Sequence, residues 1–332
     1  MRSVPAGSFE RLSGLESLWH AWLDCRRSKR RQPRLAAFDL DADTHVFRLH
    51  RALRNGSYRP ASYRLSVVRD PKLRLIAAPA IVDRIVQNAL LADIGPTYER
   101  GFIEQSYACC VGRGPHRAVL QYLSWTRRFR YRLSLDVHRY FASIRHEVLY
   151  ALFARRLRDQ RTLDLIARLL ATGGQVYRSA LAREVLGLTE KPLPPGCGLP
   201  LGGYLSHWSG GLYLDGLDHY VKRTLKIAAY QRYMDDFTLF DDNRAVLEEA
   251  REAIREWLRR ERQLEFNPRH QTVQPTTQPS TYLGFRVSRS GLLPGPKAKC
   301  RLKQRLRDAE ALGTDRLIRG LRAYRGILLT IG

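Results

Sequence analysis

Asp235 and Asp236 are adjacent carboxylates that lie between two short apolar stretches, residues 227–230 and 237–240. Two such stretches around a polar pair are typical of a β-hairpin that carries the pair at its turn. Carboxylates held side by side repel each other, so a bound cation is one explanation of the pair. A solvated polar turn is the other explanation, because aspartate is common in turns.

A third carboxylate favours the cation. Asp136 lies at the end of a stretch with strand-like alternation, residues 131–137. If this strand and the hairpin are neighbours in one antiparallel sheet, the three carboxylates meet at one edge. Oxygen ligands of this kind suit Mg²⁺, and a pair of such ions could activate an attacking hydroxyl and stabilise a leaving pyrophosphate. The structural alternative for Asp136 is an ion pair with Arg132 or Arg139.

The composition indicates the kind of partner. The chain has 332 residues, and its 57 Lys and Arg against 32 Asp and Glu give a net charge of +25. Such an excess indicates a polyanion, which is a nucleic acid or an anionic membrane surface. No apolar run approaches the ~20 residues that cross a bilayer, and the N-terminus lacks the apolar centre of a signal peptide. Nucleic acid is therefore the expected partner.

The cysteines indicate the compartment. There are 5 of them, an odd number, and none lies in a C-x-x-C spacing. Neither a disulfide framework nor a zinc site is expected from this pattern. We therefore expect a reducing, cytoplasmic setting.

Helical and strand-like segments alternate along the chain, which predicts an α+β fold without an obvious linker between domains. Asp43 is placed to cap the first clear helix. The predicted helices are 43–55, 81–94, 116–125, 146–158, 162–172, 204–226 and an amphipathic one around 247–258. The predicted strands are 63–68, 73–78 and 131–137, the two of the acidic hairpin, and a further hairpin at 282–287. Residues 191–203 and 275–280 are predicted loops, and a basic helical tail is predicted at the end.

These motifs, in this order, resemble the reverse transcriptase family over nearly the whole chain. Leu133–Phe141 resembles the first catalytic motif, Gly198–Ser206 the second and Tyr233–Asp236 the third. Leu264–His270 is similar to the fourth motif, and Tyr282–Phe285 to the hairpin that grips the primer. Upstream, residues 71–76, 83–90, 106–108 and 112–114 resemble the fingers.

The resemblance implies a role for each matching residue. The catalytic residues are Asp136, Asp235 and Asp236, which with Val137 hold two Mg²⁺ ions that Mn²⁺ can replace. The nucleotide-binding residues are Lys72, Arg74, Phe141, Pro200, Leu201 and Gly202, with Phe141 excluding a ribose 2′-hydroxyl. The primer-grip residues are Tyr282, Leu283, Gly284 and Phe285. The family's lysine in the fourth motif is replaced by Arg269 or His270, and His270 is the candidate general acid.

The resemblance also implies a right-hand polymerase with an antiparallel palm sheet, fingers and a short helical thumb. The expected domains are a basic N-terminal extension (1–60), fingers (61–130), a palm with finger insertions (131–287) and a thumb (288–332). The implied activity is RNA-directed DNA synthesis from deoxynucleoside triphosphates, with template RNA and a cDNA or primer as partners.

Leu201 distinguishes subfamilies, because group II intron and retroviral enzymes carry Gln at this position. Leu201 and the stretch Tyr213–Asp218 resemble the enzymes of diversity-generating retroelements. Those enzymes copy a template-repeat RNA, make errors opposite adenine, and work with a small accessory protein that forms a ring. His207, Gly211 and His270 depart from that pattern. A defence-associated or group II intron-like enzyme, and a non-catalytic RNA-binding protein on this scaffold, therefore remain alternatives.

Overall fold

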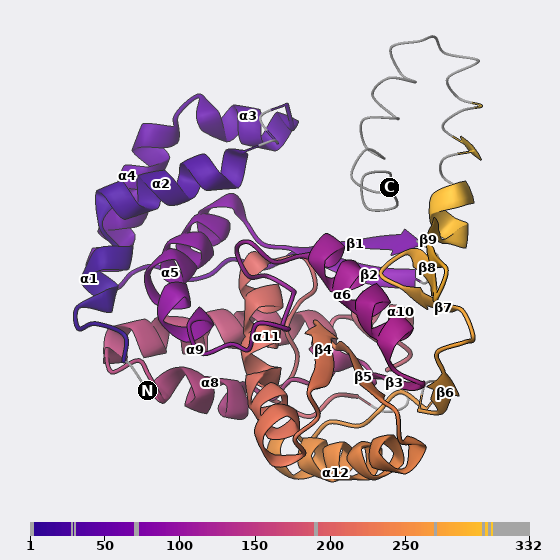
Figure 1. Ribbon diagram of the computed structural model, residues 1–332. Helices are drawn as coiled ribbons and strands as arrows, with labels where there is room; N and C mark the ends of the chain where they lie inside the picture. The colour runs from indigo at the N-terminus through magenta and orange to yellow at the C-terminus, as the bar shows by residue number, and fades with distance from the viewer. Residues whose placement is uncertain are drawn as a thin grey trace. The chain divides into compact units, whose positions relative to one another are not determined.

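The computed structural model describes residues 3–27, 29, 31–69, 73–188, 192–268, 271–300, 303, 304 and 307. Helices and antiparallel strands form two compact units, which the chain enters more than once (Figure 1). The first unit comprises Met1–Phe102, Arg139–Gly216 and Arg259–Leu264. The second unit comprises Ile103–His138, Leu217–Leu258 and Glu265–Gly332. No helix in the described part of the chain is both long and apolar enough to cross a membrane.

The N-terminal part of the first unit is a group of helices packed around a long buried one. The helices are α1 (Ser8–Leu12), α2 (Leu15–Arg26), α3 (Pro33–Asp39), α4 (Ala42–Arg54) and α5 (Ile81–Glu99). Both α1 and α2 pack on α5, and the buried side chains of Leu18 and Trp22 on α2 belong to this core. The expectation that Asp43 caps α4 was wrong. The capping position is Asp41, whose side chain makes no capping hydrogen bond, and Asp43 lies in the first turn.

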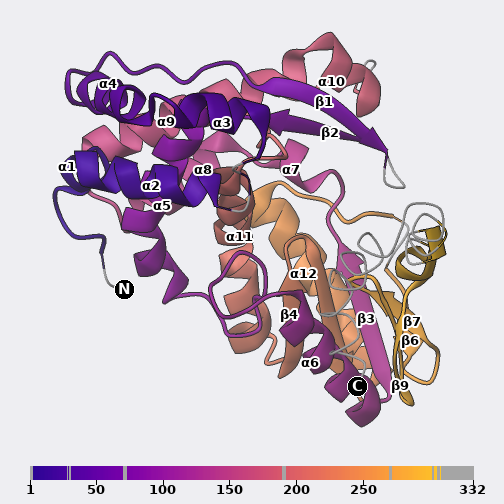
Figure 2. The ribbon, with the colours of Figure 1, turned by 90° about the horizontal axis from the view of Figure 1, so that it is seen from above.

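Strands β1 (Arg64–Arg69) and β2 (Leu73–Ala78) form an antiparallel ribbon in the first unit (Figure 2). Strand β2 alternates in burial, and Leu75 and Ala77 point into a small apolar core. That core also contains Ala142, Val176, Tyr177, Ala182 and Leu188. The alternation is the period of a strand with one buried face, and it explains why the sequence predicted this ribbon closely.

The rest of the first unit is helical. It contains α7 (Tyr140–Ser143), α8 (His146–Ala154), α9 (Gln160–Gln175) with the 3₁₀ turn Val176–Arg178, α10 (Ala180–Val185) and most of α11 (Tyr204–His219). The N-terminus of α9 is capped by Asp159, whose carboxylate accepts from the Thr162 amide at 3.2 Å. The helix predicted to reach residue 226 ends as α11 at His219 and continues as a π-helical turn, Tyr220–Thr224.

The second unit contains a four-stranded antiparallel sheet in the order β4–β5–β3–β6. Its strands are β3 (Tyr131–Asp136), β4 (Ala229–Tyr233), β5 (Asp236–Asp241) and β6 (Val273–Pro275). Helices α6 (Pro115–Arg128) and α12 (Arg244–Arg262) accompany it, and the predicted apolar stripe of α12 is buried, at Leu247, Ala250, Ile254 and Leu258. The prediction that β3 and the acidic hairpin are neighbours in one antiparallel sheet is therefore confirmed.

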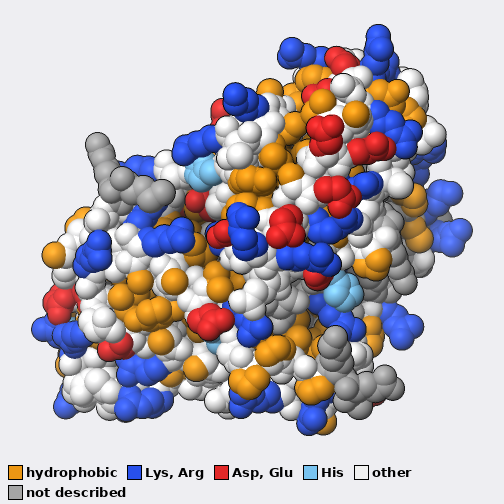
Figure 3. Space-filling view, turned by 90° about the horizontal axis from the view of Figure 1, so that it is seen from below, with side chains coloured by type: hydrophobic (Ala, Val, Ile, Leu, Met, Phe, Trp, Pro, Cys, Tyr) orange, Lys and Arg blue, Asp and Glu red, His pale blue; other side chains and the backbone are white. Residues whose placement is uncertain are grey.

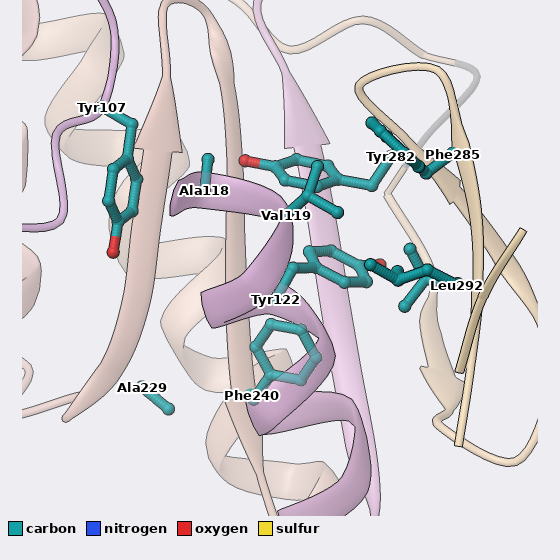
Figure 4. Close-up of a cluster of buried hydrophobic side chains, with 10 residues drawn as sticks. Tyr107, Ala118, Val119, Tyr122, Ala229, Phe240, Tyr282, Phe285 and Leu292 are labelled. Carbon is teal, nitrogen blue, oxygen red and sulfur yellow. The ribbon is translucent and has the colours of Figure 1, made fainter. Parts of the chain in front are cut away.

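A three-stranded sheet of β7 (Ser280–Tyr282), β8 (Phe285–Ser288) and β9 (Gly291–Pro294) completes the second unit. Its inner side chains pack on α6, and Figure 4 shows the ring of Tyr282 beside the ring of Tyr122. These two rings stack with centroids 4.4 Å apart. The predicted hairpin at 282–287 is confirmed, but the prediction of a helical tail directly after it was wrong, because β9 follows. Strands of three or four residues, such as β6 and β9, are too short to show a period.

Candidate active site

Three carboxylates lie at one end of the four-stranded sheet in the second unit. Asp136 ends β3 and Asp236 begins β5, and the two residues are direct partners in the antiparallel register. Asp236 is also paired with Tyr233, the last residue of β4. The two residues between these strands, Met234 and Asp235, form the hairpin turn, and Met234 has a left-handed φ of 59°. Local turn geometry and strand register therefore bring the three acidic residues together.

Asn267 fixes the position of Asp136. Its side-chain amide donates to Asp136 Oδ2 at 2.9 Å, and its backbone amide donates to the Asp136 carbonyl at 2.8 Å. The ion pair considered for Asp136 receives no support. Arg132 donates to the carbonyls of Pro275 and Gln278 and to the Gln274 side chain, and Arg139 contacts the Gly187 carbonyl at 3.4 Å. Asn267 belongs to the fourth sequence motif, but nothing in its spacing predicted this contact.

The three carboxylates concentrate negative charge around Asp235. Burial is the largest cause that raises the pKa of Asp235, and together with the negative charges of Asp236 and Asp136 and a hydrogen bond with Asp136 it brings this pKa to about 7. A proton shared between carboxyl groups is the simplest way to relieve such repulsion, and a bound cation is another. The site therefore has the electrostatics of a cation site.

The donor set fits a hard divalent cation by its chemistry. The three carboxylates offer oxygen ligands, and Val137, whose side chain is buried, adds a backbone carbonyl oxygen. Within the described residues, however, no three His, Cys, Asp or Glu side chains are already disposed around a common metal position. The side chain of Asp236 is exposed, so a cation would have to reorient carboxylates that are already neighbours.

A separate cavity in the first unit contains three of the predicted nucleotide-binding residues. Arg74 on β2, Phe141 on α7 and Leu201 line a cavity of about 200 Å³. Most of the other lining side chains are apolar, and they include Tyr177. The Phe141 ring lies edge to face against Tyr140 and His207, with centroids 5.3 and 5.4 Å away. The structure thus brings together residues that are separated by more than a hundred positions in the sequence.

Pro200 and Gly202 position the cavity and are not among the residues that line it. The Leu201 carbonyl accepts from the Ala77 amide of β2 at 2.7 Å. Gly202 has a φ of +136°, and a Cβ atom there would lie 2.7 Å from the Ala77 carbonyl oxygen. Only glycine allows the loop to approach the strand so closely. Pro200 is buried and packs against Gly173 of α9.

The predicted primer-grip residues form the tight turn between β7 and β8. Leu283 and Gly284 both have positive φ, 45° and 87°, the geometry of a two-residue hairpin turn. The side chains of Tyr282 and Phe285 are buried in the cluster of Figure 4, so their packing stabilises the hairpin. Gly284 is exposed and Leu283 half-buried, so these two residues are the accessible part of the turn.

Two predicted site residues, Lys72 and His270, lie outside the described residues, as does Arg269. The proposed roles in triphosphate binding and in general acid catalysis therefore stay predictions. The same holds for most of the predicted thumb, since residues 308–332 are not described.

Comparison with known proteins identifies the family. A family model described as "Reverse transcriptase (RNA-dependent DNA polymerase)" matches residues 69–287, which include all three carboxylates. Protein YkfC of Escherichia coli (strain K12) is 26% identical over 71% of this chain and 69% of its own length. Nuclear intron maturase 4, mitochondrial, of Arabidopsis thaliana is 24% identical over 63% of this chain, a match that spans 24% of the maturase.

A solved structure agrees at the level of the fold. Apo telomerase from Candida tropicalis superposes with a TM-score of 0.50 at 9% identity, over 74% of this chain and 50% of the telomerase chain. The expected α+β polymerase fold is thereby confirmed. The chain belongs to the reverse transcriptase family of RNA-dependent DNA polymerases.

Proposed function

We propose that this chain synthesises DNA on an RNA template by nucleotidyl transfer at Asp136, Asp235 and Asp236. The observation that carries the proposal is the direct pairing of Asp136 with Asp236 across β3 and β5, with Asp235 hydrogen-bonded to Asp136. Such clustering of negative charge is costly without a cation. Residues 136, 235 and 236 also lie within the matched family region.

In this proposal the carboxylates and the Val137 carbonyl would hold two divalent cations, Mg²⁺ or Mn²⁺, which would activate a primer 3′-hydroxyl and stabilise a leaving pyrophosphate. The bond formed would join the 3′-oxygen to the α-phosphorus. The bonds broken would be the O–H bond of the 3′-hydroxyl, whose proton passes to water, and the bond between that phosphorus and the bridging oxygen of pyrophosphate. Asn267 keeps the Asp136 carboxylate in one orientation through its 2.9 Å hydrogen bond. The roles proposed for Phe141 and Arg74, which line the cavity of the first unit, are exclusion of a ribose 2′-hydroxyl and contact with a triphosphate.

We further propose that the enzyme is error-prone at template adenines, as in diversity-generating retroelements, and works with a small ring-forming accessory protein. Leu201 supports this subtype, because its side chain lines the nucleotide cavity and cannot donate a hydrogen bond there. The two relatives named above do not themselves point to this subtype.

A group II intron-like enzyme is the second candidate. The observation that favours it is the 24% identity to an intron maturase over 210 residues. The two candidates differ in the RNA they copy and in their errors. Errors concentrated opposite adenine support the retroelement type, whereas accurate copying of a structured intron RNA supports the second candidate.

The test is primer extension on a defined RNA template with Mg²⁺ and the four deoxynucleotides, followed by sequencing of the product. We expect the wild type to extend the primer and the Asp235→Ala/Asp236→Ala variant to lose activity by at least roughly 1,000-fold. Removal of Mg²⁺ with a chelator should have the same effect, and Mn²⁺ should restore synthesis.

Asp241→Asn is the matched control, because Asp241 lies at the opposite end of β5 and pairs with Tyr131. This variant should keep wild-type activity. RNA binding without any metal-dependent synthesis would contradict the proposal and would leave the non-catalytic RNA-binding protein as the remaining alternative.

A further inference from the structure

A fully buried ion pair lies directly behind the acidic turn in the second unit. Arg232 on β4 and Asp218 at the end of α11 have side chains that are 1% and 0% exposed. Arg232 Nε donates to Asp218 Oδ1 at 2.7 Å, and an Nη donates to Oδ2 at 2.6 Å, which is a two-pronged contact. The Tyr230 hydroxyl also donates to Asp218 Oδ1 at 2.7 Å. Two residues of β4, Tyr230 and Arg232, thus hold the Asp218 carboxylate.

The same guanidinium reaches the acidic turn. The second Nη of Arg232 donates to the Met234 carbonyl at 3.0 Å, and the Nη that contacts Asp218 also donates to Ser106 Oγ at 3.1 Å. The backbone of Arg232 is anchored as well, because its amide donates to the Gln105 carbonyl and its carbonyl accepts from Tyr107. One arginine therefore links the end of α11, the 105–107 segment and the turn before Asp235.

Stability alone does not explain this pair. Desolvation of a buried ion pair offsets most or all of its Coulomb attraction, so apolar residues of similar volume would serve a core equally well. The turn, in contrast, has a specific need. Met234 has a φ of 59°, a left-handed conformation that costs a non-glycine residue of order 1–3 kcal/mol and persists only when its surroundings hold it. The hydrogen bond to the Met234 carbonyl is such a restraint.

The Met234 carbonyl belongs to the peptide plane that leads into Asp235. The orientation of that plane sets the direction in which the Asp235 side chain leaves the backbone, and Asp236 follows as the first residue of β5. We propose that Arg232, held by Asp218, is a positioning residue that fixes the Met234–Asp235 peptide and thereby aims the carboxylates of the acidic turn. This proposal rests on the proposed function for the role of those carboxylates.

Arginine is the one side chain that suits this position. Its planar group carries donors in a fixed fork, so it can bind both oxygens of Asp218 and still present a proton to the Met234 carbonyl. A lysine keeps the charge but has a single nitrogen, which cannot occupy these positions together. Arg232→Lys is therefore the informative variant, and Asp218→Asn is its complement, because it keeps the size of the side chain and removes one acceptor.

Arg132→Lys is the matched control. Arg132 lies on β3 of the same sheet, is 2% exposed, and donates to the Pro275 and Gln278 carbonyls, away from the turn. Each variant is compared with the wild type in thermal unfolding by circular dichroism, in kcat and KM for deoxynucleotide, and in Mn²⁺ affinity read from the free ion by electron paramagnetic resonance. The Mn²⁺ titration needs no synthesis.

We expect Arg232→Lys and Asp218→Asn to lower kcat by roughly 10- to 100-fold with KM within about threefold, and to weaken Mn²⁺ binding about tenfold. Arg132→Lys should lower the unfolding temperature but keep kcat and Mn²⁺ affinity within about threefold of wild type. The proposal is overturned if Arg232→Lys keeps wild-type kcat and Mn²⁺ affinity, or if Arg132→Lys loses as much of both.

The positioning role of Arg232 and the proposed function can be tested separately. If Arg232→Lys does not fold, Asp218→Asn decides by the same two measurements. If the wild type shows no metal-dependent synthesis, the proposed function fails. The Mn²⁺ titration then still decides on positioning, because unchanged affinity in Arg232→Lys contradicts it.

Discussion

At the scale of single residues, Phe141 packs against two other rings and also lines a cavity. Its ring is held edge to face by Tyr140 and His207, and it also lines the cavity that contains Arg74 and Leu201. A ring fixed on two sides cannot swing away from a bulkier ligand. This arrangement suits a residue that excludes one more hydroxyl on a sugar.

We expect Phe141→Ala to admit ribonucleotides, because it removes the ring from the cavity wall. The preference for deoxynucleotides over ribonucleotides, measured as the ratio of kcat/KM values, should fall by roughly 10- to 100-fold. Phe141→Tyr keeps the ring and should keep the preference. Strict use of deoxynucleotides by Phe141→Ala would show that another residue excludes the 2′-hydroxyl.

Leu201 carries the second prediction at this scale. Leu201→Gln introduces a hydrogen-bonding group into an apolar cavity wall, and such a bond contributes about 1 kcal/mol. Errors opposite adenine in the RNA template should therefore fall by roughly fivefold, as counted by sequencing the product. Leu201→Met, which has a similar volume and no such group, is the control. An unchanged error spectrum in Leu201→Gln would show that the side chain at position 201 does not determine fidelity.

At the scale of elements, the loop before α11 and strand β2 form one structure. The Ala77 amide donates to the Leu201 carbonyl, and Gly202 lies so close to β2 that no side chain fits. The loop therefore places Leu201 in the cavity only while this contact persists. The sequence motif from Gly198 to Ser206 therefore contains the residues that attach this loop to strand β2.

Gly202→Ala should break that docking. The added Cβ would lie 2.7 Å from a backbone oxygen, which cannot move aside as a side chain can, and the φ of +136° is strained for alanine. We expect a loss of roughly 1–3 kcal/mol in the free energy of unfolding and a raised KM for deoxynucleotide. Gly211→Ala in α11 is the matched control, since a Cβ there meets no atom within 4 Å. A Gly202→Ala variant as stable as Gly211→Ala would refute this account.

At the scale of the whole molecule, the dominant property is charge. The net charge is +25, and Lys and Arg side chains are spread over the face shown in Figure 3 instead of being gathered at one point. A spread of this kind suits an extended polyanion, which contacts many basic groups weakly, better than a small acidic ligand.

The affinity for single-stranded RNA should consequently fall steeply with salt. The slope of log K against log salt is about −0.7 for each phosphate that is neutralised, so six contacts give a slope of roughly −4. Fluorescence anisotropy between low and physiological salt measures it. An uncharged nucleic-acid analogue of the same sequence should show almost no slope. A flat curve for RNA would exclude an extended phosphate interface.

Much of the fold was predictable, because helices and strands with one buried face repeat their apolar residues with a fixed period. The stripe of α12 and the alternation of β2 are of this kind, and so is the strand that ends at Asp136. Short elements gave no such signal. The strands β6 and β9 are three and four residues long, and Asp41, the residue before α4, makes no side-chain capping hydrogen bond.

The sequence by itself determined the family motifs, the acidic hairpin and the basic charge, since these depend on residue types and on spacing along a few neighbouring positions. Only the tertiary structure decided the contacts between distant residues. It paired Asp136 with Asp236, placed Asn267 on Asp136, buried Tyr282 against Tyr122, and joined Arg232 to Asp218. The physical reason is that strand register and side-chain packing depend on which apolar surfaces are buried against each other. A local period in the chain shows that a surface is apolar but does not specify its partner.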